Sequence, residues 1–308
     1  MVIGGAEDKL NERVILSRFA KLAGGPGGHV VVISTASSLG DAATELYREV
    51  LTRLGVGRVS GLRPVTRDEA NDERAAALLD DATGIYLTGG NQLRLSSIVG
   101  GTALGAALAE AHARGAVVAG TSAGASAVST HMVAFGASGA TPKHRMAQIS
   151  AGLGLVKNVV VDQHFEQRTR LGRLLAVVAQ SPSLIGLGLD EDTAAVIHAD
   201  ETMEIIGRGA ATVVDGSQIV TDAFQTKGYR PMMVSGAILH SLPSGYRFDL
   251  RSRVLLPTAV EGPVKREEIP HELPSRRLRR LSREVAVEGA DSIAHERRRA
   301  REEREASE

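Results

Sequence analysis

Short runs of apolar, mostly β-branched residues alternate with longer amphipathic stretches along the chain. Residues 30–34, 84–88, 116–119 and 159–161 have the pattern of buried strands. Between them, residues 43–54, 104–113 and a stretch through 174–178 place apolar side chains at helical spacing. This alternation is typical of a mostly parallel sheet with helices on both faces. We therefore predict an α/β fold, a three-layer sandwich around one central sheet.

The rhythm of the pattern changes after residue 184. Residues 184–189, 194–198, 203–206 and 211–214 have the pattern of short strands separated by turns, which predicts a short antiparallel extension of the sheet. We expect one domain over residues 1–262, because no Pro/Ser-rich linker interrupts it. Residues 263–308 are rich in Arg and Glu and contain no aromatic residue. They predict a charged tail that is a solvated helix or disordered, with an Arg-rich interaction arm as the alternative.

Composition narrows the classes of partner. The 36 Lys and Arg residues balance the 36 Asp and Glu residues, so no global field attracts nucleic acid or an anionic membrane surface. We therefore expect neither as a partner. The chain has no Cys, which excludes disulfides, thiolate metal sites and a Cys nucleophile. Without a signal-type leader or an apolar run of membrane-spanning length, we expect a cytoplasmic protein.

The sequence Gly-Thr-Ser-Ala-Gly at residues 120–124 fits the nucleophile-elbow pattern Gly-x-Ser-x-Gly. It stands directly after a predicted strand and before a helix of small residues, which is the context the motif requires. The glycines leave room for a tight turn that exposes the Ser122 hydroxyl. The N–H of Ala123, at the start of the helix, is then a candidate donor to an oxyanion. A small-residue turn that only packs a helix on a sheet would have the same pattern.

A serine nucleophile needs a base, and His164 is the best placed of the nine histidines. It directly follows the strand at 159–161, so we expect it at the same carboxyl edge of the sheet as Ser122. His131 and His144 are alternatives. His112, His198, His271 and His295 are explained as packed or solvated residues.

The third member of such a triad is a carboxylate that orients the imidazole. No Asp or Glu occurs between Ala123 and Val161, which excludes any triad whose acid follows the nucleophile within this interval. The nearest candidates are Asp162, Glu166 and the run Asp190, Glu191 and Asp192. We choose Glu191, because Asp162 stands only two residues from His164 and could contact the substrate as easily as the base.

Polar residues around these positions suggest a substrate pocket. Arg168, Arg170 and Arg173 lie close together after His164, a cluster suited to binding carboxylates. The turn at residues 88–92 follows another strand; its Gly89 and Gly90 could complete an oxyanion hole, and Gln92 could bind a substrate amide. A solvated helix start and an ordinary loop are the simpler interpretations. No metal-binding or nucleotide-binding motif is present, so we expect no metal and no cofactor.

Five ordered motifs together resemble the cyanophycinases, serine exopeptidases related to the aspartyl dipeptidases. The resemblance covers about residues 2–260 and rests on residues 2–9, 88–92, 120–126, 162–173 and 190–194. It implies a class I glutamine amidotransferase-like fold, a homodimer and a triad of Ser122, His164 and Glu191. It also places Gln92, Asp162, Gln163, Arg168, Arg170 and Arg173 in the substrate pocket.

The resemblance implies cleavage of cyanophycin, a poly-aspartate carrying arginine on each β-carboxyl, to β-Asp-Arg dipeptides. A dipeptidase for aspartyl or isoaspartyl peptides is one alternative. It is disfavoured because residues 136–150, the region from which the dipeptidase branch takes its acid, contain no Asp or Glu. A non-catalytic binding protein on the same scaffold is the other alternative. The resemblance does not explain the tail.

Overall fold

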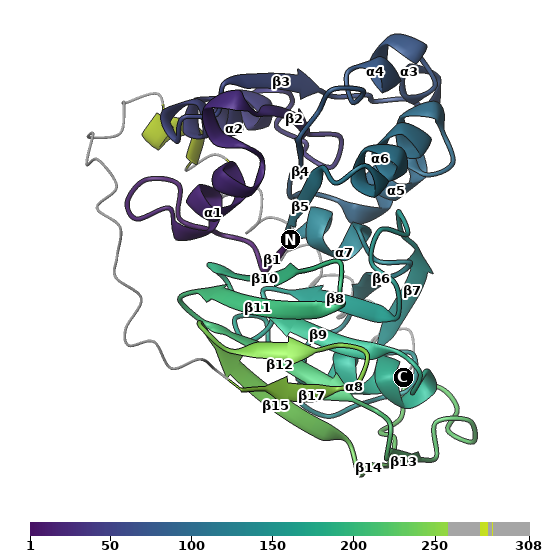
Figure 1. Ribbon diagram of the computed structural model, residues 1–308. Coiled ribbons are helices and arrows are strands. Elements are labelled where there is room, and N and C mark those ends of the chain that lie inside the picture. Colours follow the sequence, from purple (N-terminus) through teal and green to yellow (C-terminus); the bar gives the residue numbers. More distant parts are fainter. Residues whose placement is uncertain (258–277, 283–284, 286–308) are drawn as a thin grey trace.

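A central sheet of nine strands organises the protein, seen in a computed structural model that describes residues 1–257, 278–282 and 285 (Figure 1). Five of its strands run parallel, in the spatial order β1, β5, β4, β2 and β3. Their bounds are β1 (Val2–Ile3), β2 (His29–Ile33), β3 (Arg58–Leu62), β4 (Gly84–Leu87) and β5 (Val117–Thr121). Strands β2 and β4 are buried along their whole length, as expected of strands covered on both faces.

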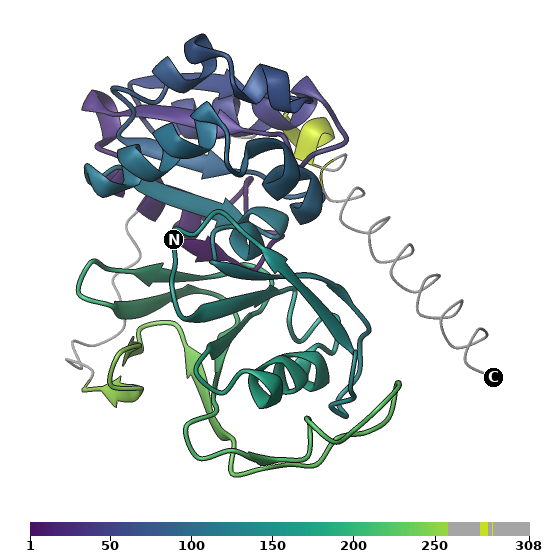
Figure 2. The same cartoon turned by 90° about the vertical axis from the view of Figure 1, so that its right-hand side faces the viewer.

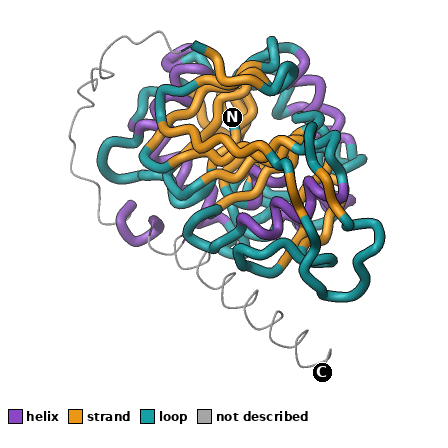
Figure 3. The backbone as a smooth tube through the Cα atoms, turned by 90° about the horizontal axis from the view of Figure 1, so that it is seen from below, coloured by secondary structure: helices purple, strands orange, loops and turns teal. Residues whose placement is uncertain are grey.

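Helices cover both faces of this parallel region, which confirms the predicted α/β sandwich. On one face lie α1 (Val14–Leu22) and α2 (Asp41–Arg53), and on the other α3 (Arg67–Ala70), α4 (Glu73–Ala77), α5 (Gln92–Val99) and α6 (Ala103–Ala113) (Figure 1). Alternate residues of β2 belong to the two apolar cores: Val30 and Val32 pack with α1 and α2, and Val31 and Ile33 with α5 and α6. Seen from below, the strands lie inside and the helices outside (Figure 3).

An antiparallel extension is present at one side of this sheet, but only two of its four predicted strands belong to it, β10 (Thr193–Ile197) and β11 (Thr202–Gly207). The other two strands of the extension, β16 (Arg247–Asp249) and β17 (Val254–Leu256), were not predicted. Strand β10 pairs antiparallel with β1, and the other three follow in turn. The short β1 therefore joins the parallel and the antiparallel halves of the sheet.

The prediction that all of these strands share one sheet is wrong. Three of the predicted strands form a separate sheet together with the unpredicted β15 (Ile238–Pro243): they are β8 (Val159–Gln163), β9 (Ile185–Leu189) and β12 (Ala210–Asp215). Helix α8 (Leu171–Gln180) packs on it where Gly186 leaves space for the side chains of Leu174 and Val178. Apolar periodicity identifies strands but not their neighbours, so the pattern could not distinguish one sheet from two. Figure 2 shows the parallel half with α1 to α6 above this second sheet and α8.

The remaining elements are small. Helix α7 (Ala123–Ala127) connects β5 to a hairpin of β6 (His131–Gly136) and β7 (Ala147–Ala151). A one-turn 3₁₀ helix spans Gly25–Gly27, and β13 (Val220–Thr221) pairs with β14 (Val234–Ser235). No helix within the described residues is both long and apolar enough to cross a membrane.

Part of the segment predicted as a solvated tail packs on the domain. Residues 278–282 are helical, and Leu278 and Leu281 are buried against the core formed by α1 and α2. The expectation that this segment has no core material is therefore wrong for these two leucines. The sequence pattern did not identify them as core residues because arginines flank both leucines. The predicted boundary at residues 262 and 263, and most of the tail, lie outside the described residues.

Candidate active site

The predicted elbow lies at the junction of β5 and α7. Strand β5 ends at Thr121, helix α7 begins at Ala123, and Ser122 between them has φ 50° and ψ −113°. A non-glycine residue rarely adopts this backbone conformation, and such strain is found where a structure holds a functional side chain in place. No larger residue fits at the two glycines of the motif, because a side chain there would overlap the backbone. A Cβ on Gly120 would lie 2.4 Å from the carbonyl of Gly124, and a Cβ on Gly124 would lie 2.4 Å from the backbone oxygen of Leu87.

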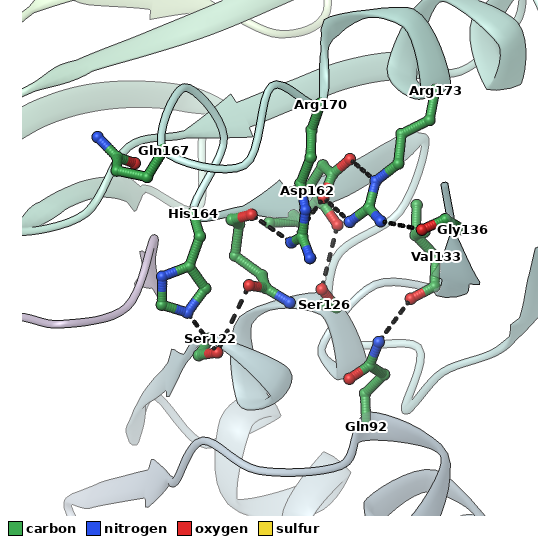
Figure 4. A network of polar contacts seen from close by, with 12 residues as sticks. Gln92, Ser122, Ser126, Val133, Gly136, Asp162, His164, Gln167, Arg170 and Arg173 are labelled. Carbon is green, nitrogen blue, oxygen red and sulfur yellow. Dashed lines mark hydrogen bonds and ion pairs between the residues drawn. The ribbon is translucent and has the colours of Figure 1, made fainter. Parts of the chain in front are cut away.

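Three residues of the predicted triad lie in a hydrogen-bonded row. The Oγ of Ser122 is 2.9 Å from Nε2 of His164, and Nδ1 of the same ring is 2.7 Å from Oε1 of Glu191 (Figure 4 for the first pair). If Nδ1 donates to the Glu191 carboxylate, Nε2 presents its lone pair to the serine hydroxyl. This is the geometry that general-base activation of a serine requires.

The electrostatics of the row favour a neutral base. Burial lowers the pKa of His164 below its usual range; the hydrogen bond to Glu191 opposes this effect, and the Arg168 and Arg170 guanidinium groups add to it. The pKa of Glu191 is lowered, chiefly by its hydrogen bond to His164. The ring is therefore unprotonated near neutral pH, and the carboxylate beside it is charged, as a base and its orienting partner should be.

His164 and Ser122 come from two different sheets, and not from one sheet as predicted. We expected both residues at the carboxyl edge of the same sheet, but β5 belongs to the nine-stranded sheet and β8 to the four-stranded one. Strand β8 ends at Gln163, directly before His164, and the N–H of His164 donates to the carbonyl of Gly4, 2.8 Å away, next to β1. The nucleophile and the base thus meet across the interface between two sheets.

The three consecutive acids that follow β9 have separate partners. Asp190 accepts hydrogen bonds from the N–H groups of Glu166 and Ala210. Glu191 bonds His164, and Asp192 accepts from the N–H of Asp8 at 2.9 Å. The pKa of Asp192 is raised, mainly by burial. Of this acidic run, Glu191 alone contacts the imidazole within the described structure, which agrees with the sequence-based choice.

Asp162, Arg170 and Arg173 occupy a different environment from the one predicted. Their exposed fractions are 0%, 0% and 2%. Arg173 forms two hydrogen bonds with the Asp162 carboxylate, Nε to Oδ2 at 2.6 Å and Nη2 to Oδ1 at 2.5 Å (Figure 4). Burial alone would raise the pKa of Asp162, but the Arg173 guanidinium outweighs it and lowers the pKa. The three side chains are buried and paired with one another, and their predicted part in the substrate pocket stays a prediction.

The two glutamines of the predicted pocket lie near the row. The amide oxygen of Gln163 is 3.5 Å from Oγ of Ser122, a longer alternative to His164 as acceptor for the single hydroxyl hydrogen. The backbone carbonyl of Gln163 accepts from Nη1 of Arg170 at 2.5 Å. The amide nitrogen of Gln92 donates to the carbonyls of Val133 and Ala134 in β6. Gln92 therefore connects helix α5 to β6, and its contact with a substrate stays a prediction.

The glycine turn predicted to complete an oxyanion hole also lies beside the serine. A Cβ on Gly89 would lie 3.3 Å from Cβ of Ser122. Gly90 has φ 132°, and a Cβ there would lie 2.2 Å from the oxygen of Ala36, so only glycine fits. The N–H of Ala123 is the first of helix α7 and has no partner within the helix. The oxyanion roles of Ala123 and Gly90 stay predictions.

Two features of this site were not assigned a role from sequence. The side chain of Gln167 accepts from the N–H of Glu191 at 3.0 Å and so positions the acid. Residues 4–9 lie against the base and against the neighbours of the acid: a Cβ on Gly5 would lie 2.4 Å from Cε1 of His164, and the carbonyl of Gly5 accepts from the N–H of Asp192. Gly4 and Gly5, which directly follow β1, were the sequence feature that could have indicated this close approach to the site. No cluster of three or more potential ligand side chains that could hold a metal ion occurs in the part of the chain described here.

Comparisons with known proteins identify the family of the chain. The model of peptidase family S51 matches residues 1–206. The chain is 37% identical over 259 residues to a cyanophycinase of Trichormus variabilis, covering 83% of this chain and 87% of the relative. It is 38% identical over 266 residues to one of Synechococcus elongatus, with coverages of 86% and 83%. A solved peptidase from an acI-B1 Actinobacterium has a TM-score of 0.56 at 23% identity, over 78% of this chain and 95% of that one, and so supports the fold.

The fold, the family match and the relatives define a hydrolytic peptidase of the serine type. The chain belongs to peptidase family S51, and its curated relatives named above are cyanophycinases. The resemblance found in the sequence motifs is thereby confirmed.

Proposed function

We propose that the protein is an exopeptidase that degrades cyanophycin to β-Asp-Arg dipeptides through an acyl-enzyme formed on Ser122. The observation that carries the proposal is the hydrogen-bonded row at the elbow: Ser122 Oγ to His164 Nε2 at 2.9 Å, and His164 Nδ1 to Glu191 at 2.7 Å. The substrate follows from the relatives named cyanophycinase at 37% and 38% identity.

In the proposed reaction, His164 removes the Ser122 proton while Oγ attacks the carbonyl of an aspartyl peptide bond. The backbone N–H groups of Ala123 and Gly90 stabilise the resulting oxyanion. Such donors are each worth about 3–4 kcal/mol of transition-state stabilisation. The imidazolium, stabilised by the charged Glu191, then protonates the leaving amine as the C–N bond breaks. A water molecule, deprotonated by His164, attacks the ester and releases the dipeptide with Ser122 restored.

The polar residues around the elbow have two proposed roles. Gln163, Gln92 and Arg168 contact the substrate, with Arg168 binding a carboxylate as arginine characteristically does. The buried network of Asp162, Arg170 and Arg173 acts on the substrate indirectly. Its support is the bond from Arg170 to the backbone carbonyl of Gln163, which holds the residue next to the base. The predicted homodimer and cytoplasmic location are also kept as proposals, and light scattering tests the first.

The experiment is incubation of the purified protein with insoluble cyanophycin, with soluble products identified by mass spectrometry. The proposal expects β-Asp-Arg dipeptides from the wild type and none from a folded Ser122→Ala variant. Hydrolysis of free aspartyl or isoaspartyl dipeptides alone would replace the polymer by short peptides as the substrate. No hydrolysis of either by a folded wild-type protein would overturn the proposal.

A further inference from the structure

A buried carboxylate lies beneath the elbow and has no role in the row of Ser122, His164 and Glu191. Glu7 is 3% exposed. Its Oε1 accepts from the hydroxyls of Tyr47 at 2.7 Å and Tyr86 at 2.9 Å, and its Oε2 accepts from the hydroxyl of Thr121 at 2.5 Å. The ammonium of Lys9 lies 3.0 Å from Oε1. Glu7 thus joins helix α2, strand β4 and the last residue of β5 before the elbow.

The donors around Glu7 keep it charged. Burial alone would raise the pKa of Glu7, but the Lys9 ammonium and the hydroxyls of Thr121 and Tyr47 outweigh it and lower the pKa to about 2. A charged carboxylate is costly to bury unless it is paired and fully hydrogen-bonded. The position of the Glu7 side chain is therefore tightly restrained. Its geometry is set by Lys9 of the same loop and by three hydroxyl donors from separate parts of the chain.

The loop that carries Glu7, residues 4–9, also contacts the other parts of the site. The carbonyl of Gly4 accepts from the N–H of His164 at 2.8 Å, and the carbonyl of Gly5 accepts from the N–H of Asp192 at 2.9 Å. Directly before the loop, the last carbonyl of β1 accepts from the N–H of Ser122 at 3.0 Å. One short segment therefore holds the nucleophile, the base and the segment bearing the acid.

The backbone of this loop is strained at its centre. Gly5 has φ 97° and the adjacent Ala6 has φ 51°, a conformation that costs about 1–3 kcal/mol at a non-glycine residue. Such a conformation persists only where the surroundings hold it. The bonds of Glu7, the next residue, supply that restraint, because they fix the far end of the turn against β4, β5 and α2.

We propose that residues 4–9 form a positioning clamp, anchored by Glu7, that keeps Ser122, His164 and the Glu191 segment at their working distances. The inference rests on the proposed function, since it assigns Ser122 and His164 their roles. Glu7 itself is a positioning residue and touches no reacting atom. Because misplacement of a reacting group by about 1 Å can cost about a hundredfold in rate, loss of the anchor should lower kcat while substrate binding is kept.

The test compares Glu7→Gln with the wild type in kcat, in KM and in the rate of Ser122 labelling by a fluorophosphonate. Asp215→Asn is the matched control. Asp215 is 3% exposed and bonded to Arg253 and Ser217, but it lies at the end of β12 opposite Ile185, the residue of β9 furthest from Glu191. We expect Glu7→Gln to lower kcat and the labelling rate about 10- to 100-fold with KM within about threefold. Asp215→Asn should lower the melting temperature and leave kcat within about twofold.

A second pair of variants covers the possibility that Glu7→Gln does not fold. Thr121→Val removes a single hydrogen bond to Glu7, and Thr121→Ser keeps the hydroxyl. We expect Thr121→Val to lower kcat about tenfold and Thr121→Ser to restore it. Wild-type kcat in folded Glu7→Gln, or in Thr121→Val, would overturn the clamp. If the wild-type protein is itself not labelled at Ser122, the proposed function fails instead, so the two failures are distinguishable.

Discussion

Within the described residues, two rows of serine, histidine and carboxylate have nearly equal distances. In the first, Ser122 is 2.9 Å from His164, which is 2.7 Å from Glu191. In the second, Ser60 is 2.9 Å from Nε2 of His29, whose Nδ1 is 2.8 Å from Asp81. Side-chain distances alone do not tell the two apart.

The backbone around each serine makes the difference. Ser122 stands on a turn with φ 50°, before the first N–H of a helix and beside the Gly89 loop. Ser60 lies inside strand β3, opposite Val31 of β2. Backbone N–H groups in a strand interior point along the sheet, so they cannot gather around an oxyanion above the serine.

The carboxylates differ as well. The side chain of Asp81 is 64% exposed and is ion-paired with Arg58, whose Nη2 also lies 2.8 Å from Nδ1 of His29. The Arg58 guanidinium therefore pairs with the Asp81 carboxylate, whose negative charge would otherwise stabilise a His29 imidazolium. We expect the second row to connect β2 and β3 without catalysing a reaction. A reactive serine needs a turn with aligned donors and an unshared acid as well as the three side chains.

The largest effect separates the two serines. Ser122→Ala should lower kcat for cyanophycin about a thousandfold or more, because the acyl-enzyme cannot form. Ser60→Ala should stay within about twofold of the wild type. Steady-state assays on folded variants compare them directly, and loss of activity in Ser60→Ala would remove the distinction between the rows.

The two acids should differ almost as much. Glu191→Gln should lower kcat about 100- to 10,000-fold, because a neutral amide cannot stabilise the imidazolium. Asp81→Asn, the matched substitution in the second row, should change kcat less than about twofold. Near-wild-type turnover in Glu191→Gln would assign the acid to another residue, with Asp162 the first to examine.

The close contact between the Gly5 backbone and the His164 ring should be needed for activity. Gly5→Ala introduces a Cβ that would lie 2.4 Å from the His164 ring, at φ 97°. We expect kcat to fall about 10- to 100-fold. Gly55→Ala is the control, since Gly55 has φ 83° with no atom within 4 Å of the added Cβ. Equal losses of activity in both variants would mean that general strain, and not contact with the base, is responsible.

The pH dependence should report on the first row alone. Burial lowers the pKa of His164, so the acidic limb of kcat/KM should lie below pH 6.5, with activity rising as the ring loses its proton. The bond from Glu191 raises that pKa, so its removal in Glu191→Gln should move the limb to lower pH. Asp81→Asn should leave the limb in place. A limb that stays unchanged in Glu191→Gln would contradict the assigned pairing.

The smallest effect on activity is expected at the second histidine. His29→Ala removes hydrogen bonds to Ser60 and Asp81 from a largely buried ring. We expect the free energy of unfolding to fall by about 1–2 kcal/mol, with kcat unchanged. Urea denaturation and turnover assays on the same preparation measure both, and a large loss of kcat without unfolding would show that the second row takes part in the reaction.

Much of this site was accessible from the sequence because it depends on local order. The elbow is a contiguous motif between a strand and a helix, and His164 and the acidic run directly follow strands. These features identified the residues that the structure brings together. The structure places Glu191 against the imidazole and gives Asp190 and Asp192 separate partners, which the sequence did not reveal. The role of Glu191 as the acid stays a prediction.

What the sequence could not supply depends on which distant segments meet. The separate sheet of β8, β9, β12 and β15 uses strands with the same apolar pattern as the first sheet, so no local signal assigns them to it. The arginines that follow His164 were predicted to bind carboxylates of a substrate, with a solvated helix start as the alternative, yet Arg170 and Arg173 are buried by pairing with Asp162. The burial of Leu278 and Leu281 was likewise not predictable, because the residues around them are charged. The second row of Ser60, His29 and Asp81 has no motif at all.

The most direct test of the difference between the rows is fluorophosphonate labelling of the folded wild-type protein, followed by peptide mapping with mass spectrometry. We predict one adduct, on Ser122, none on Ser60, and no adduct after Ser122→Ala. An adduct on Ser60, or an unlabelled Ser122 in a protein that still cleaves cyanophycin, would contradict the account.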